Sequence, residues 1–366
     1  MLLKKQQRQT NCKQNKKIGK KQAICVMAAA VLLGLTGCGK ENTQVNMGMD
    51  QVAALDYSTA ITTFESAIEQ GEDKELAYRG EGMAYMGLMD YENAVAAFEN
   101  ALSNAGMFPS DVETDINYYL ATAQYKAGMK EEAVSTLDAI ADLKQKRPDV
   151  YFLRGSIKME MDDVTHATED LNLALYYADH DTDMIIRIYQ VMERCGHKDE
   201  GRAYLTSAIE DRLSDMSDYE KGIIYFYLED YENARDNLEA FRGSGKGDAD
   251  ALLMLGRTYE QLGDSNYAAG LYQKYLAEND PEARIWNQLG LCKCRTGEYA
   301  DALTAFNSGL AMEGNASVLQ ELKFNQIVAY EYMGDFAKAA QLCRDYIQQY
   351  PDHEQAQREY TFLQTR

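Results

Sequence analysis

One glycine-rich stretch has a composition that could bind phosphate. Residues 242–248 read RGSGKGD, with three glycines around a single lysine. A phosphate-binding P-loop needs a lysine followed by Ser or Thr, whose hydroxyl reaches Mg²⁺, and it follows a strand. Here Gly247 follows Lys246, and the stretch joins two segments with helical patterns. We therefore expect no nucleotide site in this stretch.

Cysteine and histidine can bind zinc or act as nucleophiles, but their spacing here favours neither role. Cys292 and Cys294 are two residues apart, and on a helix such side chains point about 200° apart. The histidines lie in separate parts of the chain, at His166, His180, His197 and His353. Cys343 stands at a position where, in the repeat described below, most units have a large apolar residue. A cysteine there is expected to pack in the core as a small apolar side chain. The sequence therefore predicts no metal site.

Catalytic groups are also hard to find. Acid–base or nucleophilic catalysis needs a nucleophile, a base and an orienting group brought within hydrogen-bond distance, and no such set can be argued from the sequence. Acidic pairs such as Asp162 and Asp163 fall at expected turns between helices, where solvated carboxylates are common. We predict a protein that is not an enzyme and has no catalytic residues, and keep an enzyme with an unrecognised site as an alternative.

The first 37 residues have the layout of a signal peptide. Eight Lys and Arg residues and no acidic residue precede residue 22, and residues 23–35 are mostly apolar. An apolar run of this length suits a signal peptide and is shorter than the roughly 20 residues that a spanning helix needs. Residues 1–37 are therefore predicted to be a targeting segment and not part of the fold.

The end of this segment resembles the lipobox of bacterial lipoproteins, on the residues Leu35, Thr36, Gly37 and Cys38. In that family the cysteine thiol receives a diacylglycerol and the cysteine becomes the first residue after cleavage. The resemblance implies a lipid anchor on Cys38, no other cofactor, and a place on the extracytoplasmic face of a bacterial cell membrane. Residues 38–50 would carry the lipid and a short tether that runs into the folded part. The alternative is that Cys38 only ends an apolar segment.

The remaining chain is strongly acidic. Eight of the 37 basic residues precede Cys38 and all 58 acidic residues follow it, so this part is more negative than the net charge of −21 for the whole sequence. Nucleic acid binding depends on Lys and Arg that displace counterions from phosphates. Nucleic acid is therefore an unexpected partner.

A repeat runs through the acidic part. Small residues recur mostly 34 residues apart, at Ala60, Ala94, Ala133, Ala167, Gly201, Ala234, Ala268, Ala302 and Ala339. Four residues after nearly every one lies a large apolar residue, and twelve before it lies a second small residue, often glycine. Five glycines, Gly128, Gly196, Gly263, Gly297 and Gly334, precede their anchors by five residues, where a turn between helices favours positive φ.

This pattern resembles the tetratricopeptide repeat (TPR), a 34-residue unit with W-x2-L-G-x2-Y, then A-x3-F, then P. Unit eight matches best, with Trp286, Leu289, Gly290, Ala302 and Phe306, although Lys293 stands where the family has Tyr. The resemblance covers residues 41–351 in nine units. It implies an all-α solenoid of about nine helix-turn-helix repeats.

The packing follows from the residue types alone. One pair of helices cannot bury its apolar face, so neighbouring pairs stack into a solenoid. Glycine inside a helix costs about 1 kcal/mol relative to Ala, and its recurrence on the first helix predicts a close crossing of two backbones. The last unit needs a cover, and residues 352–366 are predicted to form a capping helix with Ala356, Tyr360 and Leu363 on its apolar face.

In TPR proteins the first helix of each unit lines the concave face, and this chain would place apolar and aromatic residues there. The candidate partner-binding residues are Met83, Met86, Tyr118, Tyr125, Phe152, Met159, Tyr219, Ile223, Phe226 and Phe324. Such side chains offer large adaptable contact area. They equally suit packing between first helices, so groove and core both stay open.

These observations predict a membrane-anchored, extracytoplasmic TPR scaffold or adaptor that binds a protein or peptide on its concave face without catalysis. One alternative is a glycan- or solute-binding receptor component at the cell surface, which would stack sugar rings on the aromatic residues. Another is an RNA-binding helical repeat, which the acidic composition and the signal segment both oppose.

Overall fold

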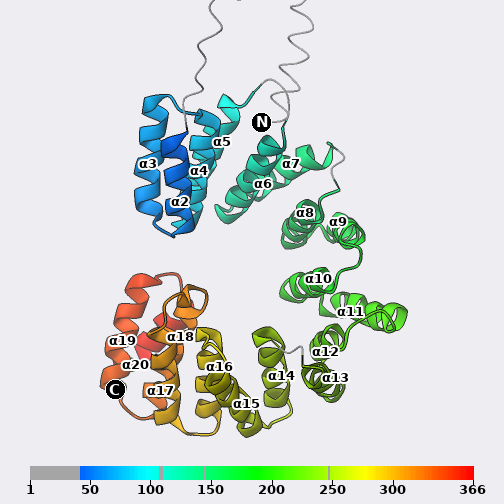
Figure 1. Ribbon diagram of the computed structural model, residues 1–366, viewed down its shortest axis with the longest axis vertical. Helices are drawn as coiled ribbons and strands as arrows, with labels where there is room; N and C mark the ends of the chain where they lie inside the picture. Colours follow the sequence, from blue (N-terminus) through cyan, green and yellow to red (C-terminus); the bar gives the residue numbers. More distant parts are fainter. Residues whose placement is uncertain (1–41, 107–109, 144–145, 246–247) are drawn as a thin grey trace, which may run out of the picture. The chain divides into compact units, whose positions relative to one another are not determined.

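The computed structural model describes residues 42–106, 110–143, 146–245 and 248–366, and every regular element in these stretches is a helix (Figure 1). Cys38 and the predicted signal peptide lie outside the described residues. The chain divides into two compact units, Met1–Gly201 and Arg202–Arg366. Each unit is described by itself.

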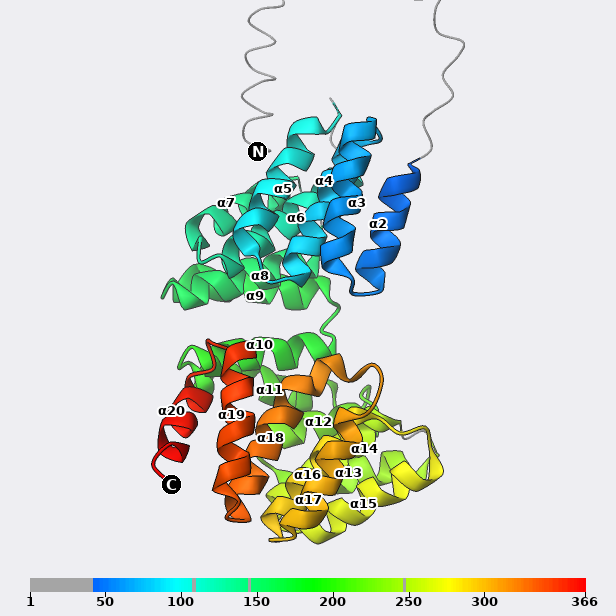
Figure 2. The same cartoon turned by 90° about the vertical axis from the view of Figure 1, so that its left-hand side faces the viewer.

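Unit 1 consists of four helix pairs and the first helix of a fifth (Figures 1 and 2). They are α2 (Thr43–Ala53) with α3 (Tyr57–Gln70), α4 (Lys74–Gly87) with α5 (Tyr91–Asn104), α6 (Asp111–Lys126) with α7 (Lys130–Ala141), α8 (Pro148–Glu160) with α9 (Val164–Tyr177), and α10 (Thr182–Arg194). The next helix, α11 (Lys198–Arg212), completes the fifth pair and runs across the boundary between the units.

Unit 2 continues the pattern (Figure 2). Its helices are α12 (Asp218–Tyr227) with α13 (Tyr231–Gly243), α14 (Ala249–Gln261) with α15 (Ser265–Glu278), α16 (Ala283–Arg295) with α17 (Tyr299–Leu310), α18 (Leu319–Tyr332) with α19 (Phe336–Gln349), and α20 (Glu354–Leu363). A short 3₁₀ helix, η1 (Asn315–Val318), precedes α18. The predicted all-α fold of nine helix-turn-helix repeats is confirmed.

The glycines of the first helices mark close crossings, as their recurrence predicts. A Cβ added to Gly82 on α4 would lie 2.6 Å from the ring of Phe98 on α5, and one added to Gly48 on α2 would lie 2.5 Å from the ring of Phe64 on α3. Both rings are fully buried. The absence of a side chain on the first helix therefore leaves the space that an aromatic ring from the second helix fills.

The turn inside each pair has one geometry in all nine repeats. The residue five before the small anchor has a φ between 60° and 88° in every case, namely Leu55, Met89, Gly128, Asp162, Gly196, Glu229, Gly263, Gly297 and Gly334. Its N–H donates to the carbonyl three residues back, and the following N–H donates to the carbonyl five back, as Gly297 and Glu298 do to Cys294 and Lys293. These two bonds form a Schellman motif, which ends a helix with a left-handed residue.

Helix α20 covers the end of unit 2. Ala356 and Leu363 are buried in one apolar cluster with Cys343 and Tyr346 of α19, and Tyr360 packs against it. A lone helix in this place removes the apolar face of the last pair from water, as a capping element of a repeat protein must.

Candidate functional site

The first helices of successive repeats contact one another within each unit. In unit 1 the series is α2, α4, α6, α8 and α10, and in unit 2 it is α12, α14, α16 and α18 (Figure 1). We call the side chains that these helices present away from their second helices the first-helix face. It is the candidate binding surface.

In unit 1 the predicted binding residues lie on α4, α6 and α8 and differ in exposure. Met83 and Met86 are half-buried and pack against the core cluster that contains Phe98. Tyr118 and Tyr125 on α6 are half-buried as well. On α8, the aromatic ring of Phe152 is half-buried and Met159 is only 2% exposed.

Tyr125 is held by its neighbour repeat. Its hydroxyl donates a hydrogen bond to Oε1 of Glu160 at 2.7 Å. Burial and this carboxylate raise the pKa of Tyr125 to about 12, so the hydroxyl stays protonated at neutral pH. Tyr125 therefore links α6 to the end of α8.

In unit 2 the predicted residues are more covered. Ile223 is 5% exposed and Phe226 is 8% exposed on α12. Tyr219, half-buried on the same helix, packs its ring against Phe241 at 5.2 Å between centroids. Phe324 on α18 is half-buried and contacts the rings of Tyr346 and His353 on the C-terminal side.

The ten predicted residues thus differ in exposure. Unit 1 gathers Tyr118 and Phe152 on neighbouring first helices with part of each ring open to solvent, whereas Met159, Ile223 and Phe226 are buried. The role of these residues as a groove stays a prediction.

Ion pairs connect successive first helices. Arg79 on α4 lies 2.5 Å from Asp115 on α6, Arg194 on α10 lies 3.1 Å from Glu160 on α8, and Arg284 on α16 lies 2.6 Å from Asp250 on α14. Arg295 on α16 also pairs with Glu260 on α14. These ladders neutralise most of the arginines on the first-helix face.

Two arginines on this face have an aromatic ring in place of a carboxylate. Arg187 on α10 holds its guanidinium carbon 4.0 Å from the centroid of the Phe152 ring. Arg257 on α14 lies 5.2 Å over the ring of Phe226. Both side chains are exposed, and within the described stretches neither forms an ion pair.

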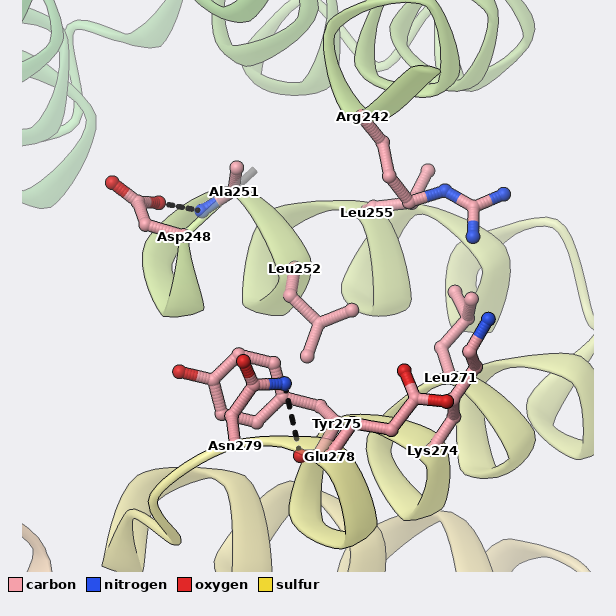
Figure 3. Close-up of a pocket in the computed structure, with 10 residues that line it drawn as sticks. All are labelled: Arg242, Asp248, Ala251, Leu252, Leu255, Leu271, Lys274, Tyr275, Glu278 and Asn279. Carbon is pink, nitrogen blue, oxygen red and sulfur yellow. Dashed lines mark hydrogen bonds between the residues drawn. The ribbon is translucent and has the colours of Figure 1, made fainter. Parts of the chain in front are cut away.

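Two cavities lie among the helices of unit 2. The smaller, about 210 Å³, is lined from α13, α14 and α15 (Figure 3). Figure 3 shows Leu252 and Leu271 in this cavity beside charged Arg242, Lys274 and Glu278. Arg242 already pairs with Glu239 at 2.5 Å. The mixed lining provides no set of convergent polar groups that would fix a ligand.

The larger cavity, about 450 Å³, lies between α15, α16 and α17. Trp286, Leu289 and Lys293 of α16 contribute to its lining. Lys293 stands where the TPR pattern has Tyr, and its Nζ turns to Glu298 at 2.7 Å. The cavity thus lies where a tyrosine ring would otherwise add volume.

Cysteines and other side chains that could bind a metal or act as nucleophiles occur across the described ranges. No cluster of three metal-ligating side chains occurs among the described residues. Burial raises the pKa of Cys292 to about 12 and the pKa of Cys294 to about 11. Thiols with such values carry almost no thiolate, the nucleophilic form, at neutral pH. Among the helices that the structure describes, none is long and apolar enough to span a membrane.

Sequence reasoning missed Arg187 and its stacking on Phe152. The sequence separation of arginine–aromatic contacts between repeats varies, since Arg79 lies over Tyr119, Arg187 over Phe152 and Arg257 over Phe226. No fixed spacing existed that would have revealed them.

Comparison with known proteins supports the repeat assignment. One tetratricopeptide repeat model matches residues 79–148, 219–284 and 253–317, and a second matches residues 322–353. No curated protein matches the sequence.

Several solved structures are similar to this chain. A tetratricopeptide repeat protein from Parabacteroides merdae is 15% identical over 69% of this chain and 99% of that chain, with a TM-score of 0.44. MamA from Desulfovibrio magneticus is 15% identical over 48% of this chain and 96% of that chain, with a TM-score of 0.40. YrrB, described as a TPR protein with an unusual peptide-binding site, is 22% identical over 52% of this chain and 97% of that chain, with a TM-score of 0.36.

Proteins built from these repeats are typically non-catalytic scaffolds that bind proteins or peptides. The family matches together cover more than half of the sequence, and the described helices form the stacked pairs of that fold. The chain therefore belongs to the tetratricopeptide repeat family.

Proposed function

We propose that this protein is a non-catalytic adaptor, anchored by a lipid on Cys38 to the extracytoplasmic face of a bacterial cell membrane, that binds a protein or peptide partner on its first-helix face. The observation that carries the binding surface is the pair of part-exposed rings, Tyr118 and Phe152, on neighbouring first helices of unit 1. Aromatic side chains of this kind provide large contact area at a small cost in side-chain entropy.

The anchor rests on the sequence of residues 1–38. A basic segment, an apolar run and the residues Leu35 to Cys38 occur in the order that lipoprotein processing requires. Two or more acyl chains hold a protein on a bilayer durably, whereas one chain binds only marginally. The partner of such an adaptor is extracytoplasmic.

The anchor is tested by expressing the full chain and a Cys38→Ala variant in a bacterium. We expect wild type in the membrane fraction, with a mass increase from diacylglycerol on an N-terminal Cys38, and the variant without the lipid. An unmodified Cys38, or an N-terminus elsewhere, would contradict the anchor.

The binding surface is tested by in-cell crosslinking of the tagged chain, followed by mass spectrometry of the crosslinked species. A Tyr118→Ala, Phe152→Ala double variant should lose its main crosslinked protein and stay folded. The matched control is Tyr176→Ala, which removes a tyrosine 67% exposed on the second helix α9.

Two outcomes would redirect the assignment. Unfolding of the double variant would show that the two rings belong to the core and not to a groove. A folded, anchored chain that crosslinks to no protein, but binds cell-wall fragments in isothermal titration, would favour glycan binding.

A further inference from the structure

Four of the five described arginines of unit 1 form an ion pair with a carboxylate, and one does not. Arg79, Arg147, Arg154 and Arg194 each have a carboxylate within 3.1 Å. Arg187 is the fifth, and it has no acidic partner in the described residues, although the chain carries 58 acidic residues against 37 basic ones. Among the described arginines of unit 1, Arg187 is thus the exception.

The surroundings of Arg187 hold the guanidinium in place without neutralising it. Its carbon lies 4.0 Å from the centre of the half-buried Phe152 ring. A ring face attracts a cation by about 0.5–1 kcal/mol at an exposed site but leaves its net charge intact. Because the ring covers one face only, the N–H groups in the guanidinium plane stay available for a fork-like contact with a carboxylate.

Neighbouring groups extend this site along the first-helix face. Burial and Asp149 raise the pKa of Tyr118 on α6, and the charge of Arg187 offsets part of that rise. Arg147 lies over the Tyr118 ring at 5.4 Å and pairs with Asp149 at 2.9 Å. The carboxylate that acts on Tyr118 is thus already engaged by Arg147, and the Phe152 ring lies against the free cation.

We propose that Arg187 receives a carboxylate from an extended segment of the partner protein, an Asp or Glu whose apolar neighbour packs on Phe152 and Tyr118. This inference rests on the proposed function and adds the chemistry of the ligand. The first-helix face repels a polyacidic segment, because the rest of the surface is acidic. The segment therefore carries one carboxylate among apolar residues.

Unit 2 contains a second arginine that stacks on an aromatic ring without an ion pair among the described residues. Arg257 on α14 stacks on Phe226 of α12 at 5.2 Å and likewise lacks an acidic partner among the described residues. Its aromatic ring is 8% exposed, so this site offers a cation with little apolar surface beside it. We expect it to contribute less to binding than Arg187.

The test uses the folded chain after residue 38, immobilised through a C-terminal tag, and a displayed library of random short peptides. Sequences with one Asp or Glu beside apolar residues should be enriched. One enriched peptide is then labelled and measured by fluorescence anisotropy against wild type and variants.

For Arg187→Ala we expect the Kd to rise roughly 10- to 100-fold, the effect of losing a hydrogen bond between charged groups. Replacing the acidic residue of the peptide by its amide should weaken binding to wild type equally and add nothing to the effect of Arg187→Ala. The matched control is Arg194→Ala, an exposed arginine on the same helix that already pairs with Glu160. Thermal unfolding of each variant checks that it is folded.

Three results would overturn the proposal. An enriched set without acidic preference, or equal binding by Arg187→Ala and wild type, would refute the carboxylate contact and leave peptide binding intact. Enrichment of no peptide by the folded chain would refute peptide binding as well, and with it that part of the proposed function.

Discussion

Repeat four (α8 and α9) and repeat eight (α16 and α17) begin from the same pattern and fill their interiors differently. Each has a glycine on its first helix, Gly155 or Gly290, and a lysine three residues later where the TPR pattern has Tyr. In repeat four, Lys158 Nζ lies 2.8 Å from Asp170, whose side chain is 4% exposed and also pairs with Arg154. The interior of repeat four is therefore partly ionic.

Repeat eight has no such acid. Gly290 faces the fully buried ring of Phe306, and Lys293 turns outward to Glu298 beside the 450 Å³ cavity. The comparison shows that small and large residues at fixed spacing determine how two helices cross. Residues outside the pattern, such as Arg154 and Asp170, determine what fills the remaining space.

The largest difference between the two repeats should follow from removing the buried acid. Asp170→Ala leaves Arg154 and Lys158, with side chains 13% and 17% exposed, without their shared partner. Breaking a buried ion pair costs about 3–5 kcal/mol of unfolding free energy. Urea unfolding of the variant and of wild type measures this loss of unfolding free energy. Asp138→Ala, which removes the 53% exposed partner of the same Arg154, should cost less than about 1 kcal/mol, and equal losses would contradict the ionic interior.

The same lysine-to-tyrosine change should have opposite effects in the two repeats. Lys158→Tyr removes one of two cations from Asp170 and should destabilise the fold by about 2 kcal/mol. Lys293→Tyr places a ring at the 450 Å³ cavity and loses only a pair with Glu298, whose side chain is 41% exposed against 4% for Asp170, so a gain of about 1 kcal/mol is expected. Thermal unfolding compares the two, and shifts of the same sign would show that the interiors do not differ as described.

A methyl group on the crossing glycine should separate the repeats further. A Cβ on Gly290 would overlap the Phe306 ring, whereas one on Gly155 would find its nearest atoms at 3.0 Å. Overpacking typically costs about 1–3 kcal/mol, so Gly290→Ala should lower the unfolding midpoint more than Gly155→Ala. If Gly290→Ala is harmless, the ring can move and the crossing is looser than the distances imply.

The smallest effects should come from the turns. Asp162 in repeat four and Gly297 in repeat eight occupy the same left-handed position, with φ of 64° and 81°. A side chain in this region costs about 1–2 kcal/mol, less for Asp, so Gly297→Ala should destabilise by about 1 kcal/mol. Asp162→Gly should stabilise by a few tenths of a kcal/mol. Denaturant titration of both variants checks the signs, and two changes of equal sign would contradict a shared turn geometry.

Much of the fold follows from the sequence because periodicity and glycine spacing act locally. The anchors from Ala60 to Ala339 and the five turn glycines predict nine pairs, and the helices bear this out. The left-handed conformation of Leu55, Met89, Asp162 and Glu229 could not be predicted, since such residues rarely adopt it and only the flanking helices impose it.

The candidate site was less predictable, because it depends on which arginines form ion pairs with carboxylates in the folded protein. Position on the first helix gave Tyr118 and Phe152, but it could not separate them from buried Phe226. Arg187 is distinguished only by what the other arginines of unit 1 contact, which is a property of three dimensions.

The ion pairs between successive first helices have a mechanical consequence. Within each unit, pairs such as Arg79 with Asp115 and Arg284 with Asp250 join one repeat to the next at its first-helix edge. The arginine side chains in these pairs are long and part-exposed, so they can change rotamer as the helices move apart. Added salt screens the attraction between the paired charges. Each unit should therefore bend more readily along this edge as ionic strength rises, so that its elasticity, unlike its helical framework, depends on the surrounding medium.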